Sequence, residues 1–221
     1  MIKCLITRPN HDKVTAYLFA WNSKILESDE LKDISFLDLQ GENANKKKVE
    51  SYLSKQSPEV VLFNGHGSPT QVYGFKNEVI IENNINDSLL KDKIVYALSC
   101  SSASVLGVNA VKKGAKSFIG YKRSFILCTD KNRETTPLKD NIAHSFLEPS
   151  NRLSISILKG NSINEASHKS KEEFKKEISK YASTKSMPGA DRIASALLWN
   201  MSNQVVLGNK EAKINPISRN Y

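Results

Sequence analysis

The sequence predicts an α/β fold in which helices flank a mostly parallel sheet. Short apolar, β-branched runs recur along the chain, and helix-length segments with apolar residues at three- and four-residue spacing separate them. Parallel strands require long crossovers of this kind, and helices usually supply them. No Gly-, Ser- or Pro-rich stretch divides the chain, so we predict a single domain over residues 1–221.

The first half of the chain alternates most regularly. We expect strands at Ile2–Thr7, Ile34–Leu39, Glu59–Asn64, Ile94–Leu98 and Ser117–Tyr121. We expect helices at His11–Leu26, Asn45–Lys55 and Ser102–Lys113, with a short helix near Asn86–Leu90. The stretch between Ser68 and Asn86 contains Pro69, Gly74 and Asn-rich turns, so it predicts a small hairpin.

The C-terminal third is predicted to be mainly helical. A polar loop opens it at Thr129–Asn141. We then expect helical segments at Asn141–Leu147, Arg152–Lys159, Ile163–Tyr181 and Ala190–Ser202. A last strand at Gln204–Leu207 follows these segments.

The composition is that of a globular protein, with 39% hydrophobic and 25% charged residues. The formal charge is +9, from 32 Lys+Arg against 23 Asp+Glu. Lysines gather at Lys46–Lys48, Lys112–Lys116 and Lys169–Lys180, where solvated helix faces are predicted. Neither an RNP-type aromatic motif nor zinc-finger spacing accompanies this charge, so nucleic acid is not an expected partner.

We expect no targeting or membrane segment at the N-terminus. Its short apolar run is broken at Arg8 and Pro9, before a signal-peptide core or a membrane span could form. The three cysteines, Cys4, Cys100 and Cys128, form no C-x-x-C pair and fit a reducing compartment. We therefore expect a cytoplasmic protein without membrane association, in which an unusual thiol has a chemical role.

Two predicted strands end in reactive side chains. VVLFNGHGS at Val60–Ser68 presents His66, and KIVYALSCSSAS at Lys93–Ser104 presents Cys100. Ligands of open α/β sheets bind at the carboxyl ends of the strands, so a base and a thiol there favour a Cys–His hydrolase. Each residue alone also has an ordinary structural explanation, Cys100 as a small buried side chain and His66 as a loop residue.

The residues around this pair suit nucleophilic catalysis. Gly65 and Gly67 let the chain turn sharply and bring backbone N–H groups to a bound carbonyl. We expect the N–H groups of Gly67 and Cys100 to hold the oxyanion, at about 3 kcal/mol for each donor. A helix starting at Ser102 and a nearby imidazole would both favour the thiolate of Cys100. His66 would take the thiol proton and return it to the leaving amine.

Other kinds of nucleophile site are not supported by the sequence. A Cys phosphatase needs an arginine a few residues after the nucleophile to hold phosphate, and Leu106 stands at that position. A nucleophile elbow needs a glycine two residues before and two after the nucleophile, and Leu98 and Ser102 occupy those places.

Nucleotide and metal sites also lack support. GHGSPT contains a G-x-G, but neither the longer dinucleotide pattern nor a P-loop pattern exists in the chain. His66, Cys100, Cys128 and His144 could meet around a metal, but none of them form a close-spaced ligand pair. We therefore expect neither a metal nor another cofactor.

The order of these motifs resembles a known family. FNGHGS, then ALSCSSAS, then GAKSFIGY at Gly114–Tyr121, is similar to the caspase-like cysteine peptidases of clan CD, nearest to the gingipain-type and CHAT-type branches. LLWNMSNQVVLGN at Leu197–Asn209 loosely resembles the closing helix and strand of gingipain-type domains. Those domains often finish in Gly-Asp-Pro, whereas Asn209 and Lys210 follow Gly208 here. The resemblance implies a caspase-like three-layer sandwich.

The resemblance also implies roles for the reactive residues. In this family a strand-end His-Gly and a following strand-end Cys form the catalytic dyad, which places these roles on His66 and Cys100, with Gly67 as an oxyanion donor. The chain would then be a thiol protease, a cysteine endopeptidase acting in regulated proteolysis. Its substrate would be a protein or peptide, and a regulatory protein subunit or the ordering of a loop would control it.

Substrate-binding residues are less well defined. Related folds build part of the groove from the loop after the fifth strand, so the candidates are Arg123, Asp130 and Glu134. The alternative function is a non-catalytic caspase-like binding module that holds an acidic protein or nucleic acid on the basic surface. Salt-sensitive binding that survives loss of Cys100 and of His66 would distinguish this module from the enzyme.

Overall fold

A computed structural model describes residues 1–184 and 187–214 of the chain. Within these residues, the main sheet has six strands in the order β2-β1-β3-β6-β7-β8. Their bounds are β1 (Ile2–Arg8), β2 (Ile34–Gln40), β3 (Val60–Asn64), β6 (Ile94–Leu98), β7 (Ser117–Tyr121) and β8 (Gln204–Gly208). Neighbouring strands are parallel except β7 and β8, which are antiparallel. The predicted α/β class with a mostly parallel sheet is confirmed.

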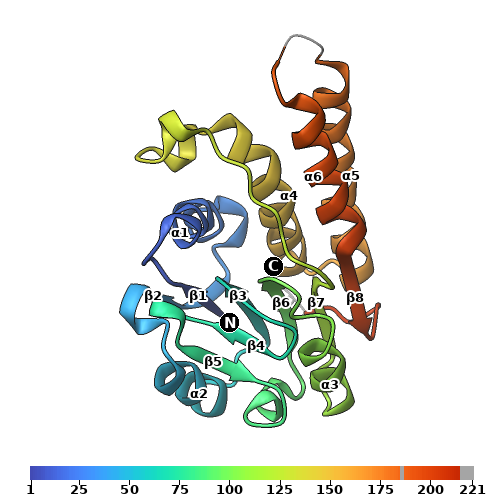
Figure 1. The fold of residues 1–221 in the computed structure, drawn as a ribbon. Coiled ribbons are helices and arrows are strands. Elements are labelled where there is room, and N and C mark those ends of the chain that lie inside the picture. Colours follow the sequence, from blue (N-terminus) through green and yellow to red (C-terminus); the bar gives the residue numbers. More distant parts are fainter. Residues whose placement is uncertain (185–186, 215–221) are drawn as a thin grey trace.

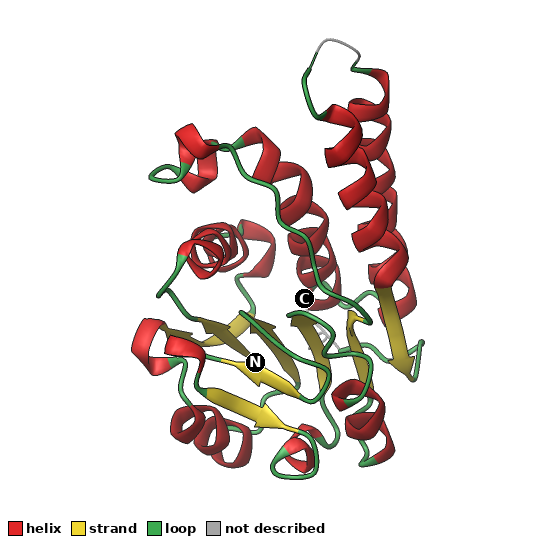
Figure 2. Ribbon diagram, in the orientation of Figure 1, coloured by secondary structure: helices red, strands yellow, loops and turns green. Residues whose placement is uncertain are grey.

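Helices cover both faces of this sheet (Figures 1 and 2). On one face lie α1 (Lys13–Leu26) and α4 (Asn141–Leu158), and on the other lie α2 (Lys46–Lys55) and α3 (Leu106–Lys112). A hairpin of β4 (Gln71–Tyr73) and β5 (Val79–Glu82) lies beside α2, as the pattern between Ser68 and Asn86 predicts. The arrangement is a three-layer one, compatible with a caspase-like sandwich.

The last two helices form a separate antiparallel pair. They are α5 (Ile163–Ser183) and α6 (Ala190–Asn203), and in Figure 1 their far ends extend well beyond the sheet. A third apolar cluster, which includes Phe146 from α4, Phe174 from α5 and Leu197 from α6, holds them to α4. The pair returns the chain to the sheet edge, where β8 adds beside β7.

The two faces of the sheet bury alternate residues of the same strands. Cys4 and Ile6 of β1 pack toward α1 and α4, whereas Leu5 packs toward α2 and the hairpin. All five residues of β3 and all five of β6 are buried. A parallel strand covered on both faces reads in the sequence as a continuous apolar run, which is why these strands are recognisable without alternation.

Helix α4 differs from the prediction, which treats it as two segments. It runs without a break through Pro149, although proline cannot donate the helical hydrogen bond and usually bends or ends a helix. Phe146, Leu153 and Ile157 lie on both sides of the proline and are fully buried. The apolar packing of these side chains offsets the loss of a single backbone hydrogen bond.

The loop that follows β7 is tied to the body of the protein through Asp140. This buried carboxylate caps α4 by accepting from the N–H groups of Ile142 and Ala143, and it also accepts from the N–H of Asp130. The hydroxyl of Tyr17 on α1 donates to it as well, at 2.7 Å, and burial together with this carboxylate raises the pKa of Tyr17. The loop is therefore attached to α1, next to the carboxyl ends of the strands.

No helix within the described residues is both long and apolar enough to pass through a lipid bilayer.

Candidate active site

The strand register brings His66 and Cys100 to the same edge of the sheet. β3 and β6 are direct parallel neighbours, and their last paired residues are Asn64 and Leu98. His66 and Cys100 each lie two residues beyond that pair. The carboxyl ends of the two strands therefore present the imidazole and the thiol side by side, as the sequence predicts.

Both side chains line one cavity of about 300 Å³. The lining combines residues of the two strand ends with apolar side chains from α1 and from the loop after β7: Val14, Leu18, Gly65, His66, Leu98, Ser99, Cys100, Phe125 and Leu127. Among these described residues, His66 is the only one with an ionisable nitrogen or oxygen. The cavity is therefore an apolar hollow with a base and a thiol at its wall.

The turn that carries His66 depends on its two glycines. Gly65 has a φ of +144°, which side chains rarely allow, and a Cβ there would lie 2.8 Å from the carbonyl oxygen of Tyr73. A Cβ on Gly67 would lie 2.9 Å from the Cβ of Ser99 and 3.0 Å from the carbonyl oxygen of Cys100. The absence of both side chains lets the His66 turn pack directly on the Cys100 turn.

A carboxylate that the sequence analysis missed completes the site. Oδ2 of Asp12 lies 2.7 Å from Nε2 of His66, so the imidazole donates to the carboxylate through Nε2. Asp12 follows β1, the strand on the other side of β3, and it is the N-cap of α1. The carboxyl ends of three adjacent strands thus supply a carboxylate, an imidazole and a thiol.

Asp12 is held as an anion by its hydrogen bonds. Partial burial raises its pKa, but the N–H of Thr15, donating at 2.8 Å, and the imidazole of His66 lower it more, so the pKa lies below the ordinary carboxyl value. An ionised Asp12 orients the His66 ring and fixes its proton on Nε2. Nδ1 of His66 is then the nitrogen with a free lone pair, the form that a general base needs.

Cys100 lies in a turn, not directly before a helix as predicted. Helix α3 starts at Leu106, not at Ser102, because the backbone first runs along the end of β7. The N–H of Ser101 donates to the carbonyl of Arg123, and the N–H of Ala103 donates to the carbonyl of Tyr121. Ser101 also has a left-handed φ of +58°, which no helix allows. The predicted contribution of a helix N-terminus to the thiolate is therefore wrong.

The predicted oxyanion donors are the backbone N–H groups of Gly67 and Cys100, in the turns that follow β3 and β6. The hydrogen bonds that hold the two turns use the N–H groups of Ser68, Tyr73 and Ser101. Within residues 1–184 and 187–214, no such backbone hydrogen bond uses the N–H of Gly67 or of Cys100. Neither of these N–H groups is used to hold the turns together, and their role as oxyanion donors stays a prediction.

The other two cysteines are less suited to nucleophilic chemistry. Cys4 is fully buried in β1, and burial strongly raises the pKa of its thiol. Burial also raises the pKa of Cys128, which packs against the apolar cluster between α4, α5 and α6. Cys100 is the cysteine that lines the cavity with an imidazole, while its sulfur makes a long contact of 3.9 Å with the carbonyl of Phe125.

The residues predicted to bind substrate are not part of the cavity lining. Arg123 is exposed, and it is its backbone carbonyl that supports the Cys100 turn. Asp130 caps a short turn of the loop, and Glu134 pairs with Lys13 at 2.5 Å. The same loop instead contributes Phe125 and Leu127 to the lining. The prediction located the loop that lines the cavity but not its residues.

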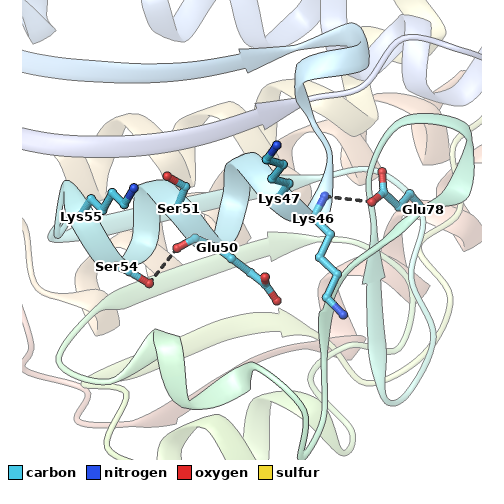
Figure 3. A pocket seen from close by; sticks show the side chains of 7 residues that line it. All are labelled: Lys46, Lys47, Glu50, Ser51, Ser54, Lys55 and Glu78. Carbon is cyan, nitrogen blue, oxygen red and sulfur yellow. Dashed lines mark hydrogen bonds between the residues drawn. The ribbon is translucent and has the colours of Figure 1, made fainter.

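A second hollow lies on the surface of α2 (Figure 3). It has a volume of about 510 Å³ and is lined by Lys46, Lys47, Glu50, Ser51, Ser54, Lys55 and Glu78. Glu50 lies among the lysines, and Glu78 accepts from the backbone N–H of Lys46 at 3.2 Å. The mixed charge of this hollow gives no specific support to a site for nucleic acid or an acidic protein.

Comparison with models of known protein families and with curated proteins finds no match to this chain.

Proposed function

We propose that this chain is a cysteine endopeptidase of caspase-like type. The observation that carries the proposal is the register of β3 and β6, which presents His66 and Cys100 on one cavity with Asp12 on the far nitrogen of the imidazole. Thiol, base and orienting carboxylate from three adjacent strands form the arrangement that activates a nucleophile.

The reaction would proceed through a thioester. Nδ1 of His66 takes the proton of Cys100, and the thiolate sulfur attacks the peptide carbonyl carbon. The N–H groups of Gly67 and Cys100 bind the oxygen of the tetrahedral intermediate. His66 then gives its proton to the leaving amine, and a water molecule, deprotonated by the same nitrogen, hydrolyses the thioester and frees Cys100.

The cavity lining favours an apolar side chain next to the scissile bond. Val14, Leu18, Phe125 and Leu127 surround the reactive pair, and the lining includes no carboxylate, lysine or arginine among the described residues. A charged side chain placed there would lose its hydration without gaining a partner, which is costly. We therefore expect cleavage after medium-sized apolar residues rather than after aspartate or arginine.

An unbiased peptide library tests this function. The expected result is cleavage concentrated after apolar residues by the wild-type protein, and no cleavage by the Cys100→Ala variant. A Cys128→Ser variant is the matched control, because it removes a thiol that lies outside the cavity lining. Retained cleavage by Cys100→Ala would contradict the proposal, and a strict preference for a charged residue would contradict the assignment of the cavity.

We propose regulated proteolysis of a protein partner as the role of this enzyme. The loop after β7 contributes Phe125 and Leu127 to the cavity, and Asp140 at its other end connects it to α1. A regulatory protein that moved this loop would change the cavity directly. Adding candidate partners to the library assay would reveal such control as a change in rate without a change in the cleaved sequence.

A further inference from the structure

His11 faces the pair formed by Asp12 and His66, and the catalytic steps above do not use it. Its Nε2 lies 3.5 Å from Oδ2 of Asp12, the same oxygen that accepts from Nε2 of His66 at 2.7 Å. The two imidazole rings meet edge to face, with their centroids 6.2 Å apart. One ligand atom from each of the three residues lies within 4.8 Å of the others. Two imidazoles thus converge on a single carboxylate.

The surrounding structure fixes His11 in this orientation. Its side chain is only 10% exposed, and its ring packs edge-on against Phe75 at 5.6 Å. Nδ1 is buried and has no hydrogen-bond partner among the described residues. An unpaired buried nitrogen costs free energy, and an exposed position would avoid that cost. The polar contacts of the ring, to Asp12 and at 3.4 Å to Oδ1 of Asn77, are made through Nε2 alone.

We propose that His11, Asp12 and His66 bind a zinc ion. Two imidazole nitrogens and a carboxylate oxygen form a common donor set for Zn²⁺, with water in the fourth position. Tetrahedral ligands at about 2.1 Å from the metal lie about 3.4 Å from one another. The two imidazole-to-carboxylate spacings, 2.7 and 3.5 Å, bracket that distance, and one ligand atom of each residue lies within 4.8 Å of the others. Asp12 and His66 are 36% and 34% exposed, so the ion reaches the site from solvent.

The site has a consequence for catalysis that rests on the proposed function. As a base, His66 carries its proton on Nε2, which donates to Asp12, and uses the lone pair of Nδ1. A zinc ion takes the lone pair of Nε2, so the proton that was there moves to Nδ1. Nδ1 then has no lone pair to accept the thiol proton. Zinc would therefore inhibit the peptidase without contacting Cys100.

Direct titration with Zn²⁺, followed by calorimetry and by competition with a chromogenic chelator, tests the binding. The expected result is one ion bound by the wild type and by Cys100→Ala with affinities within about twofold of each other. His11→Gln and His66→Gln should bind zinc more than about 100-fold more weakly than the wild type. This loss exceeds the one expected for a residue that only hydrogen-bonds to a metal ligand. His168→Gln is the matched control, because His168 is an exposed histidine on α5.

Two results would overturn the site. If His11→Gln bound zinc with the affinity of the wild type, His11 would not be a ligand. If Cys100→Ala lost zinc binding, the ion would be bound by the thiol instead. Thermal unfolding adds a readout that is independent of activity, because a ligand that binds only the folded state raises its melting temperature. Zinc should raise the melting temperature of the wild type and of Cys100→Ala. If His11→Gln does not fold, Asp12→Asn replaces it as the variant that lacks one ligand.

Activity measurements separate the zinc site from the proposed function. Zinc should inhibit cleavage by the wild type, and a chelator should restore it, whereas His11→Gln should keep its basal activity and resist zinc. Equal inhibition of His11→Gln would contradict the inhibitory mechanism. If no variant cleaves any peptide but zinc binding follows the pattern above, the peptidase proposal fails while the metal site stands.

Discussion

Two hollows of this molecule differ in what lines them and in how the fold produces them. The hollow at the strand ends, about 300 Å³, is smaller than the one on α2, about 510 Å³. The smaller one is built by the ends of two adjacent strands, β3 and β6, which present His66 and Cys100, and its remaining walls are mostly apolar. The larger one lies along a single helix between long charged side chains (Figure 3). The larger hollow thus lacks a candidate nucleophile, whereas the smaller one combines an imidazole with a thiol.

Replacing the thiol should have the largest effect. Cys100→Ala removes the nucleophile, and we expect kcat/KM for peptide cleavage to fall by at least about 10⁴-fold, because catalytic residues that act as a unit are lost together. Cys128→Ser, outside the cavity lining, should stay within about twofold of the wild type. Steady-state kinetics on the best library peptide measures both. Comparable losses of kcat/KM in the two variants would show that Cys100, in the strand-end cavity, matters no more for cleavage than a cysteine outside it.

A methyl group at Gly67 should have the next largest effect. Gly67→Ala places a Cβ 2.9 Å from the Cβ of Ser99, so the two turns must separate and the N–H of Gly67 moves away from the substrate oxygen. We expect kcat to fall about 100-fold, which is the usual cost of one oxyanion donor. Overpacking should also destabilise the fold by about 1–3 kcal/mol.

Denaturant unfolding measured beside the kinetics separates these two effects of Gly67→Ala. A suitable control is Gly189→Ala, because a Cβ at Gly189, although at a φ of +79°, would meet nothing within 4 Å. The control should lose some stability and keep its kcat. Full activity of Gly67→Ala would contradict the close packing of the His66 turn on the Cys100 turn.

Removing the charge of Asp12 should have a smaller effect. Asp12→Asn keeps a good N-cap for α1 but loses the anion that orients His66, and we expect kcat/KM to fall about 10- to 100-fold. The loss is smaller than the roughly 10⁴-fold found for a buried triad aspartate because Asp12 is 36% exposed and partly screened by solvent. Unchanged kinetics would show that the carboxylate does not act on His66.

The pH dependence of stability provides a second test of Asp12. Its pKa is lowered in the folded state, so its contribution is present above the pKa of the unfolded chain and disappears as pH falls through the folded pKa. The wild type should thus exceed Asp12→Asn in free energy of unfolding near neutral pH, by less than about 1 kcal/mol. This difference in free energy of unfolding should vanish in acid. A difference that grew in acid would contradict a lowered pKa of Asp12 in the folded state.

The hollow on α2 should show the smallest effect. Lys46→Ala and Lys47→Ala leave the strand ends untouched, and we expect kcat/KM to stay within about twofold of the wild type because surface substitutions rarely disturb a fold. The same assay measures them. A loss above about tenfold would give the α2 hollow a part in substrate binding and end the contrast between the two regions.

The residues that define the strand ends were predictable for a physical reason. β3 and β6 are buried on both faces, so their sequences are uninterrupted apolar runs, and His66 and Cys100 stand directly after the runs. The predicted strand bounds at Ile94–Leu98 and Ser117–Tyr121 agree with the structure. Their placement next to each other followed because parallel strands end at a common edge.

The partners of these residues were not predictable in the same way. Asp12 lies in the pattern of an ordinary helix N-cap, and only the strand order β2-β1-β3 brings it next to His66. An aspartate at the end of the strand that neighbours β3 was the one signal available. The predicted start of α3 was wrong because Ser101–Ser104 resembles a helix-capping sequence. In the structure, hydrogen bonds to the end of β7 hold this segment in turns. Both differences arise from contacts between segments distant in sequence.

Covalent labelling of the thiol tests the central claim most directly. A peptide that carries an electrophile after an apolar residue would be incubated with the wild type, Cys128→Ser, His66→Ala and the control His168→Ala, and the adducts would be located by mass spectrometry. We predict one adduct, on Cys100, at equal rates in the wild type and both controls, and at least about 100-fold slower labelling in His66→Ala. An adduct on Cys128, or equal rates in His66→Ala and the wild type, would contradict activation of Cys100 by His66.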